Sequence, residues 1–424
     1  MKWSIYNISN LSKEGNFLLY NYSTDKILIL LPELYSIVKK YKNNADGINH
    51  IHPELYEILC KNGFIVDVNL NEAEIIEQKI IKNLSSTNIL YLTINPTLDC
   101  NLRCWYCYEE HTQNCYMTNE TIERIIKLVG KKASDENLHT IYLGFFGGEP
   151  LLKANKIALP LIQKIKNICN IHKKKLKLNF TTNGVLLSKD LADKLAETGL
   201  KVHFQIPFDG GHLLHNKTKF TSNGNGTFHH IIKNIEYGLS KGFDFTIRCN
   251  YTNENIESFI ELADEMSKLT HYGENRIRFS LQKVWQEKYS DILMRKVTKL
   301  KLYLKEKSLI SKFAIDDIPN HCYADYKSSI IINYNGDIFK CTARSFNHHE
   351  RIGILENDGN ITETERAKLY NINRFRPQCR SCKLLPICVI CIQKKIENNT
   401  CEIKKEDIDC QLRMKLMAVI EKYI

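Results

Sequence analysis

The sequence of 424 residues lacks any apolar run that approaches the roughly 18 residues of a membrane-spanning helix. Its first residues show no charged segment followed by an apolar one, which argues against secretion and for a cytoplasmic protein whose thiols stay reduced. Short repeats and low-complexity linkers are absent as well. The net charge is +11, but Lys and Arg are spread along the chain apart from residues 173–177, which does not indicate a nucleic-acid-binding protein. What remains is the composition of a soluble globular protein with room for two or three domains.

Cysteine is abundant, and Cys100, Cys104 and Cys107 lie within eight residues. Thiolates at this Cys-x3-Cys-x2-Cys spacing can bind three irons of a cubane iron-sulfur cluster and leave the fourth iron without a protein ligand. His111 is within reach of a zinc site, but the resulting spacing is not a usual zinc spacing. Disulfides would require an oxidising compartment. The triplet therefore predicts a cluster with one open iron, which is a reaction site.

Together with the aromatic Tyr106 before its third cysteine, the triplet resembles the cluster loop of the radical S-adenosylmethionine (SAM) enzymes. The resemblance implies that SAM binds the open iron of a [4Fe-4S] cluster through its amino and carboxylate groups. One-electron reduction of the cluster then cleaves the sulfonium to a 5′-deoxyadenosyl radical, which abstracts a hydrogen atom.

The middle of the chain, residues 86–310, alternates strand-like and helix-like runs. Six strands separated by helices predict an α/β fold with a parallel sheet and right-handed crossovers, curled into a partial (βα)6 TIM barrel. Ligands of such sheets bind at the carboxyl ends of the strands. The strands are expected at residues 88–94, 140–146, 176–182, 201–206, 244–250 and 276–282, and helices at 121–132, 156–172, 188–198, 228–241 and 254–270.

Residues 1–85 contain no catalytic or metal-binding sequence motif. They show short strand-like runs followed by helix-like segments at 32–43 and 52–62. This pattern resembles the small winged-helix-like β/α domain of enzymes that modify ribosomally made peptides, in which a leader peptide adds a strand to the sheet edge. A plain cap over the catalytic domain is the alternative.

Two motifs follow the second and third predicted strands. Gly147, Gly148, Glu149 and Pro150 form a GGEP segment, in which glycines allow close backbone approach and the glutamate can accept hydrogen bonds from an ammonium. In the family that the sequence resembles, this segment holds the amino group of SAM. Thr182 and Asn183 belong to a segment that looks like the family's TNG motif, although a β-turn alone would explain it.

The fourth and fifth strands also end in candidate residues. Asp209 is a candidate catalytic carboxylate that orients substrate or accepts a proton. Relatives often have a ribose-binding serine where Pro207 stands and an arginine where Lys219 stands, so the ribose contact is in doubt. Arg248 and Asn250 are candidates for binding the SAM carboxylate and its surroundings, since Arg offers that group a planar fork.

Eight further cysteines lie in the last quarter of the chain, and two CxxC pairs among them indicate a metal site. A predicted hairpin with an Asn335-Gly336 turn separates the first two of the eight. The arrangement resembles the SPASM domain, with two auxiliary [4Fe-4S] clusters, and residues 311–424 are assigned to it. The resemblance implies a first auxiliary cluster bound by Cys322, Cys341 and Cys391, with either an open iron or Cys401 completing it, and a second bound by Cys379, Cys382, Cys388 and Cys410.

The last quarter of the chain has an alternative interpretation, and four other cysteines are not assigned to any metal site. The spacing of Cys388 and Cys391 is one residue shorter than the usual pattern. A ribbon with two zinc ions is the alternative, because four thiolates suit zinc as well as iron. The cysteines expected to be packing residues are Cys60, Cys115, Cys169 and Cys249.

Together these features predict a radical SAM/SPASM maturase that takes a hydrogen atom from a ribosomally made precursor peptide and leaves a crosslink or an oxidised residue. The implied partners are a precursor peptide with a leader segment and a flavodoxin- or ferredoxin-type reductant. An anaerobic sulfatase maturase, which makes formylglycine, is the alternative within the family, but such enzymes carry an aspartate where this sequence has Thr342. A non-catalytic iron-sulfur carrier or a zinc-stabilised binding protein is the alternative of another class.

Overall fold

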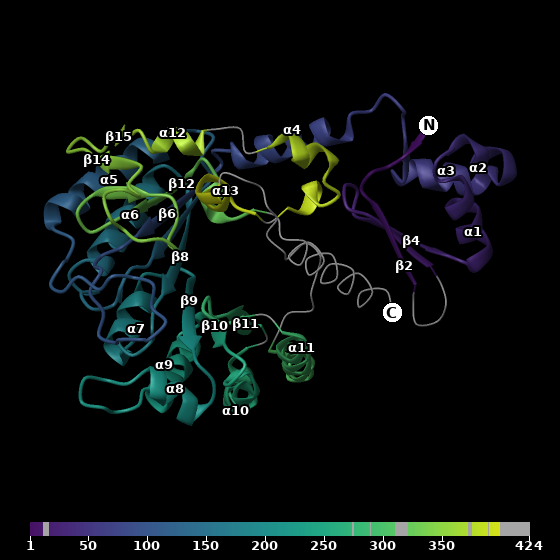
Figure 1. Cartoon of the computed structure of the whole chain (residues 1–424). Coiled ribbons are helices and arrows are strands. Elements are labelled where there is room, and N and C mark those ends of the chain that lie inside the picture. The colour runs from purple at the N-terminus through teal and green to yellow at the C-terminus, as the bar shows by residue number, and fades with distance from the viewer. Residues whose placement is uncertain are drawn as a thin grey trace. The chain divides into compact units, whose positions relative to one another are not determined.

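The structure is a computed structural model that describes residues 1–11, 17–273, 275–288, 290–309, 321–371, 375–388 and 390–398 (Figure 1). The chain divides into two compact units. One combines residues 1–86 with 313–326 and 371–424, and the other combines residues 87–312 with 327–370. Within the described part of the chain, no helix is both long and apolar enough to cross a membrane.

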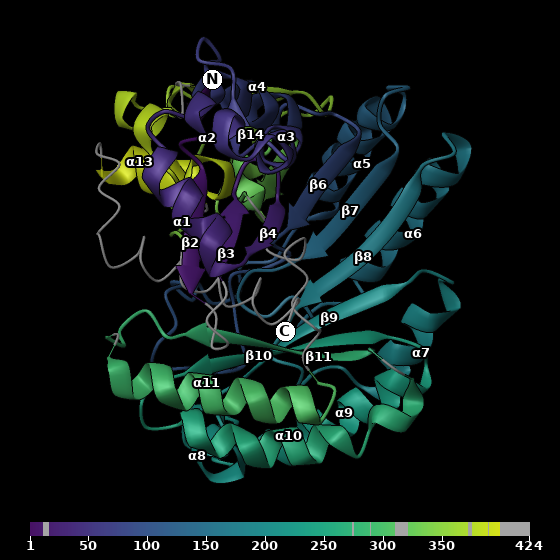
Figure 2. The same cartoon turned by 90° about the vertical axis from the view of Figure 1, so that its right-hand side faces the viewer.

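The second unit is built on six parallel strands that pair in chain order (Figure 2). Each lies within two residues of its expected bounds, and the predicted partial (βα)6 barrel is confirmed. The strands are β6 (Ile89–Ile94), β7 (Thr140–Phe145), β8 (Lys175–Thr181), β9 (Val202–Phe208), β10 (Asp244–Tyr251) and β11 (Ile277–Lys283).

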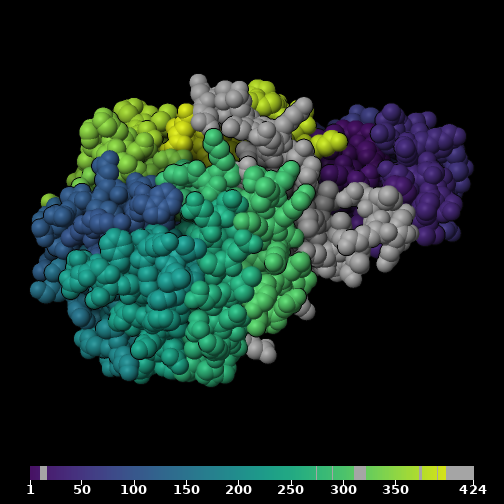
Figure 3. All heavy atoms as spheres, turned by 60° about the horizontal axis from the view of Figure 1, so that its bottom comes forward, coloured from purple at the N-terminus to yellow at the C-terminus, as the bar shows by residue number. Residues whose placement is uncertain are grey.

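Helices cover the outer face of this sheet, and residues of this unit form the blue, teal and green surface in Figure 3. Alternate residues of each strand point outward into an apolar core shared with the helices. Phe145, Phe180, Phe204 and Phe245 occupy paired positions on four neighbouring strands, with ring centroids 4.9 to 5.4 Å apart. Such an aromatic row fixes the register of the strands, because a slip of one residue would turn every ring away from the core. The helices are α5 (Asn119–Ala133), α6 (Ala158–Ile171), α7 (Lys189–Glu197), α8 (His212–Thr218), α9 (Phe228–Ser240), α10 (Phe259–Ser267) and α11 (Asp291–Glu306).

Two features of this unit were not predicted. Helices α8 and α11 lie where no helix was expected, and α11 completes the sixth strand-helix pair.

The expected hairpin is confirmed, with Gly336 at a φ of +89° in its turn. Its first strand also pairs in parallel with β6, which extends the barrel sheet to ten strands. The added strands are β12 (Ser329–Ile332), β13 (Asp337–Phe339), β14 (Gly353–Leu355) and β15 (Ile361–Glu363), followed by α12 (Ala367–Tyr370).

The first unit begins with a small β/α arrangement close to the predicted one. Strands β2 (Asn7–Leu11), β3 (Phe17–Asn21) and β4 (Lys26–Leu30) form an antiparallel sheet. Strand β1 (Lys2–Trp3) pairs with β5 (Ile65–Val66). The helices of this region are α1 (Pro32–Tyr41), α2 (Asp46–Ile51), α3 (Pro53–Lys61) and α4 (Glu72–Leu84).

The cysteine-rich segment belongs to this same unit. It contains two short 3-10 turns, Pro377–Ser381 and Leu385–Ile387, and helix α13 (Ile392–Asn398). The apolar face of α4 packs with residues from both ends of the chain, so the beginning and the end of the sequence share one core. Its buried members are Tyr6, Tyr20, Tyr22, Ala73, Ile76, Ile80, Leu84, Phe375, Cys379, Leu384, Leu385 and Ile387.

Candidate functional site

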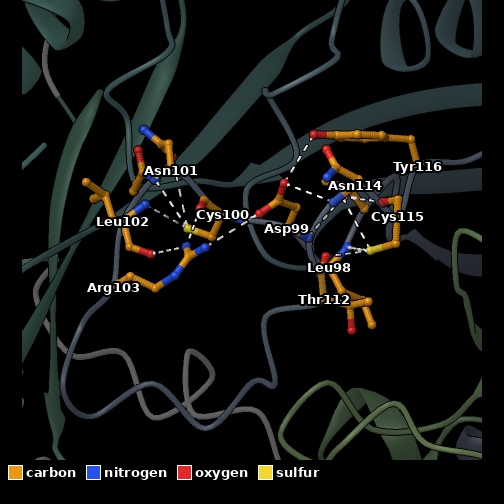
Figure 4. Close-up of polar contacts among 12 residues, drawn as sticks. Leu98, Asp99, Cys100, Asn101, Leu102, Arg103, Thr112, Asn114, Cys115 and Tyr116 are labelled. Atoms are coloured by element: carbon orange, nitrogen blue, oxygen red, sulfur yellow. Dashed lines mark hydrogen bonds and ion pairs between the residues drawn. The ribbon is translucent and has the colours of Figure 1, made fainter. Parts of the chain in front are cut away.

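The loop with the cysteine triplet connects β6 to α5 and is closed at its base. Thr97 forms a β-bridge with Tyr116, and the amide of Met117 donates to the carbonyl of Pro96 at 2.8 Å. The Asp99 carboxylate accepts hydrogen bonds from the Cys100 amide at 2.9 Å and from the Tyr116 hydroxyl at 3.2 Å (Figure 4). The Asp99 carboxylate therefore connects the beginning and the end of the loop next to the first cysteine.

Cys115 helps to hold this base and, as expected, is buried. Its thiol donates to the carbonyl of Thr112 at 2.9 Å and accepts from the amide of Leu98 at 3.3 Å (Figure 4). Cys169 and Cys249 are buried as well, whereas Cys60 is partly exposed. The expectation that these four cysteines pack rather than bind metal fits their positions.

The three cysteines of the triplet are neighbours within the loop. The Cys107 amide donates to the Cys104 carbonyl at 3.0 Å, and the Cys100 thiol accepts from the Leu102 amide at 3.4 Å. Loss of solvation raises the pKa of all three thiols, that of Cys100 to about 12; Cys104 and Cys107 raise that of Cys100 further, and Cys104 that of Cys107. A metal that binds these thiols must displace their protons, as metals that coordinate thiols do.

Within the described ranges, no three Cys, His, Asp or Glu side chains surround a point where one metal ion could bind. A cubane cluster makes a different demand, because each thiolate binds a separate iron and the three sulfurs stay apart. The donor set of three thiols on one loop fits that demand. The assignment of Cys100, Cys104 and Cys107 to a cluster stays a prediction.

The GGEP segment lies directly against the cysteine loop. Gly147 has a φ of +110°, and a Cβ on Gly148 would lie 2.2 Å from the carbonyl oxygen of Asp99. The amides of Gly148 and Glu149 donate to the carbonyls of Thr97 and Asp99 at 3.1 and 2.8 Å. The glycines thus allow the end of β7 to approach the backbone of the loop more closely than any side chain permits.

Glu149 is fully buried and joins the ends of β7 and β8. Its carboxylate accepts hydrogen bonds from the Thr182 hydroxyl at 2.7 Å, the Asn183 amide at 2.8 Å and the Leu151 amide at 2.9 Å. Burial nevertheless raises the pKa of Glu149 to about 7. A buried carboxylate of this kind favours a cation beside it, because only three neutral donors offset the loss of water.

The TNG segment joins the same assembly. The Asn183 side-chain amide donates to the Asn101 side-chain oxygen at 2.8 Å, and its nitrogen lies 3.9 Å from the Cys100 sulfur. The structure therefore brings together the cysteine loop and the ends of β7 and β8. Pro150 follows Glu149 in the segment that begins this crossover.

The ends of β9 and β10 carry a second polar cluster. Asp209 forms a buried ion pair with Lys219, whose ammonium also donates to the Tyr106 hydroxyl at 2.6 Å. The side-chain amide of Asn250 donates to the same hydroxyl at 3.0 Å. Arg248 donates through its Nε to the Asn250 side-chain oxygen at 2.9 Å. The candidate residues at these strand ends thus form one connected network with the loop.

Three residues of the site were missed from the sequence. Asp99 and Asn101 flank the first cysteine, and their roles in closing the loop and contacting Asn183 depend on contacts between segments far apart in the chain. Burial raises the pKa of Glu109 to about 8, and one of its oxygens is buried without a hydrogen-bond partner among the described residues. The only sequence feature that could have indicated Glu109 is its position two residues after the third cysteine.

The auxiliary cysteines are divided between the two units. Cys322 and Cys391, 69 positions apart, lie within hydrogen-bonding reach in the first unit, and the proton shared from Cys322 lowers the pKa of Cys391. Cys379 and Cys388 both lie near Cys382, because burial raises the pKa of Cys382 and the charges of these two cysteines raise it further. Cys341 belongs to the second unit. Cys401 and Cys410 lie outside the described residues.

Comparisons with known proteins agree with this site. Residues 94–266 match the family model of the Radical SAM superfamily. The chain is 22% identical over 407 residues to the radical SAM cyclopropyl synthase TigE of Paramaledivibacter caminithermalis, which covers 87% of this chain and 82% of that protein. It is 28% identical over 320 residues to a probable GTP 3′,8-cyclase of Methanococcus aeolicus, covering 68% of this chain and 99% of that protein.

Among solved structures, native anSMEcpe with bound AdoMet and Kp18Cys peptide is similar in fold. The TM-score is 0.54 at 18% sequence identity, over 71% of this chain and 88% of that chain. Residues 94–266 are therefore a domain of the radical SAM superfamily, and the barrel of strands β6 to β11 in which they lie has the fold of that solved structure. A radical SAM domain implies an enzyme that uses SAM and a SAM-binding [4Fe-4S] cluster.

Proposed function

We propose that the protein is a maturase that modifies a ribosomally made precursor peptide. The observation that carries the proposal is the assembly of the cysteine loop, Glu149 and the Tyr106 network at the carboxyl ends of five parallel strands. The fold of a neighbour bound to a peptide supports a peptide substrate. When bound, the cluster and SAM supply a 5′-deoxyadenosyl radical that abstracts hydrogen from the peptide.

The residues of the site have distinct tasks in this proposal. Cys100, Cys104 and Cys107 bind the cluster. Glu149 receives the ammonium of SAM, which would relieve the cost of its burial. Arg248 is partly buried on the inner face of β10, and its guanidinium would bind the carboxylate of SAM. The proton-accepting role expected for Asp209 is a proposal as well, and its carboxylate is engaged in a buried ion pair with Lys219.

The last quarter of the chain is proposed to be a SPASM domain with two auxiliary clusters. The pairing of Cys322 with Cys391 supports the first cluster, and the grouping of Cys379, Cys382 and Cys388 supports the second. In this proposal Cys341 is the third ligand of the first cluster, which has either an open iron or Cys401 as its fourth, and Cys410 completes the second cluster. The clusters would accept the electron left after bond formation, and a flavodoxin- or ferredoxin-type protein would supply electrons, in a reducing cytoplasm.

A leader segment of the precursor is proposed to pair with the edge of the N-terminal sheet. Strand β4 lies at that edge, and Ile29 on it and Leu31 just beyond it are 53% and 59% exposed. An apolar strand with an unpaired edge is suited to receive another strand. The alternative is that residues 1–85 only cap the enzyme.

A second candidate function is the cyclisation of GTP, which the likeness to a probable GTP 3′,8-cyclase favours. The sulfatase maturase alternative still has Thr342 against it.

The test uses the full chain, purified and reconstituted with iron and sulfide without oxygen. It is incubated with SAM and dithionite, alone, with GTP, or with short peptides encoded beside its gene. The proposal expects 5′-deoxyadenosine in every case and a mass change only in a peptide. Iron-loaded protein that yields no 5′-deoxyadenosine would contradict the enzyme assignment, and conversion of GTP instead of peptide would favour the second candidate.

A further inference from the structure

The fully buried ammonium of Lys219 binds three elements of the barrel together. Lys219 follows α8 and is 1% exposed, and its carboxylate partner Asp209 follows β9 and is 3% exposed. Its Nζ also donates to the Tyr106 hydroxyl at 2.6 Å and lies 5.2 Å from the centre of the same ring. The side-chain amide of Asn250 on β10 donates to that hydroxyl at 3.0 Å. One tyrosine of the cysteine loop therefore receives two hydrogen bonds from the barrel wall.

Lys219 keeps its proton, and so its positive charge, in this position. Burial by itself lowers the pKa of Lys219, but the carboxylate of Asp209 and the neighbouring Tyr106 more than offset this, so the pKa is raised overall. A buried charge that lost its partner would be strongly unfavourable, which holds the ion pair in one arrangement. Tyr106 therefore has a charged donor at a fixed position, and hydrogen bonds from charged groups are the stronger ones.

Tyr106 also differs from the residues around it in the loop. Trp105 and Tyr108 are 63% and 48% exposed, and Cys107 is exposed too. The Tyr106 side chain alone among residues 105–108 is partly buried, and it stands between Cys104 and Cys107. A side chain in this place sets where both thiols lie relative to β9 and β10.

We propose that Lys219 is a positioning residue that acts through Tyr106 to hold the tip of the cysteine loop against β9 and β10. This inference rests on the proposed function in so far as Cys104 and Cys107 bind the cluster at which SAM docks. Misplacing the tip would weaken the docking of SAM without removing a ligand of the cluster.

The test is a thermodynamic cycle of three reconstituted variants of the full chain. Tyr106→Phe removes the hydroxyl, and the double variant D209N/K219M removes both charges so that neither is left unpaired. The third variant combines all three substitutions. The dissociation constant of SAM is measured from the change that SAM causes in the electron paramagnetic resonance spectrum of the reduced cluster, and iron content and the melting temperature of the apoprotein are measured in parallel.

We expect D209N/K219M to raise the dissociation constant about tenfold, which corresponds to one hydrogen bond from a charged group, and Tyr106→Phe to raise it at least as much, because it also removes the hydrogen bond from Asn250. The triple variant should match Tyr106→Phe alone, because D209N/K219M then removes no further contact of Tyr106. Effects that multiply to about a hundredfold would show that Lys219 acts independently of Tyr106 and would overturn the proposal. Constants within about twofold of wild type would overturn it too, because a broken hydrogen bond costs more than that.

A matched control exists on the outer helices of the same barrel. The Tyr237 hydroxyl donates to Asp193 at 2.9 Å, and Asp193 pairs with Lys241 at 2.6 Å. Tyr237→Phe and D193N/K241M should leave the dissociation constant of SAM unchanged. Loss of iron from Tyr106→Phe with an unchanged apoprotein melting temperature would support the proposal, whereas loss of iron with a lowered one would count against it.

Different results would refute the proposed function and the role of Lys219. Wild-type protein that binds no iron, or whose spectrum does not respond to SAM, would refute the proposed function. A normal wild-type response with unaffected variants would refute the role of Lys219 alone.

Discussion

Glu149 predicts an unusual dependence of stability on pH in the protein without cluster and SAM. Its carboxyl is fully buried, and the ion pairs of the described residues include none with Glu149. Burial raises its pKa from 4.5 to about 7. The folded state therefore binds this proton more tightly than the unfolded chain does. The stability that Glu149 contributes is complete below pH 4.5 and is lost as the pH rises through about 7.

The size of the effect follows from the shift. A rise from 4.5 to about 7 corresponds to about 3 kcal/mol of unfolding free energy between the protonated and ionised forms. We expect the apoprotein to lose this amount between pH 5 and pH 8 relative to Glu149→Gln, which does not titrate. Urea unfolding of both proteins at several pH values measures the difference. Comparing the two pH profiles separates the titration from any constant cost of the substitution, and parallel profiles would refute the reasoning.

The same shift predicts how SAM binding responds to pH. An ammonium beside Glu149 would lower its pKa, so SAM should bind the ionised form and displace a proton below pH 7. Affinity should then rise up to tenfold per pH unit until about pH 7 and level off above it. Equilibrium dialysis with labelled SAM measures this. A flat profile between pH 5.5 and 8 in the wild-type protein would show that SAM does not contact this carboxylate.

Three further predictions test the loop, the cluster and the peptide-binding edge. Gly148→Ala places a methyl group 2.2 Å from a backbone oxygen of the cysteine loop and should abolish SAM binding, whereas the control Gly130→Ala, with open space around it in α5, should stabilise the fold by about 0.5–1 kcal/mol in thermal unfolding. Cys104→Ala should end 5′-deoxyadenosine formation while iron of the auxiliary clusters stays bound, and retained cleavage would refute the triplet assignment. Ile29→Asp should weaken precursor binding, measured by fluorescence anisotropy, more than Ile51→Asp, an equally exposed control on α2, and equal effects would make the N-terminal sheet a cap.

The barrel strands were predictable because their signal is local. Alternation such as that of Leu90, Leu92 and Ile94 reflects a sheet with one face on a buried core. The missed helix α11 had a signal as well, since Leu293, Val297, Leu300 and Leu304 follow helical spacing. The pairing of β12 with β6 had none, because it joins segments more than 230 residues apart.

In the site, too, local sequence motifs were predictable and contacts between distant segments were not. The cysteine triplet, GGEP and TNG segments are short and could be located by spacing alone. Their contacts could not, because Asp99 bonds to Tyr116 and Lys219 to Tyr106 only after strands from distant parts of the chain align. The ligand sets of the auxiliary clusters depend in part on residues beyond those described, so they stay predictions.

The shared core of the first unit has a consequence for how the protein is made. Helix α4 packs with Leu384, Leu385 and Ile387, about 300 positions later in the chain. A ribosome releases the early partner long before the late one, so this core closes only when synthesis is nearly finished, while the intervening barrel has all of its strands already. Until then the apolar side of α4 is uncovered, and the nascent chain needs protection from aggregation there.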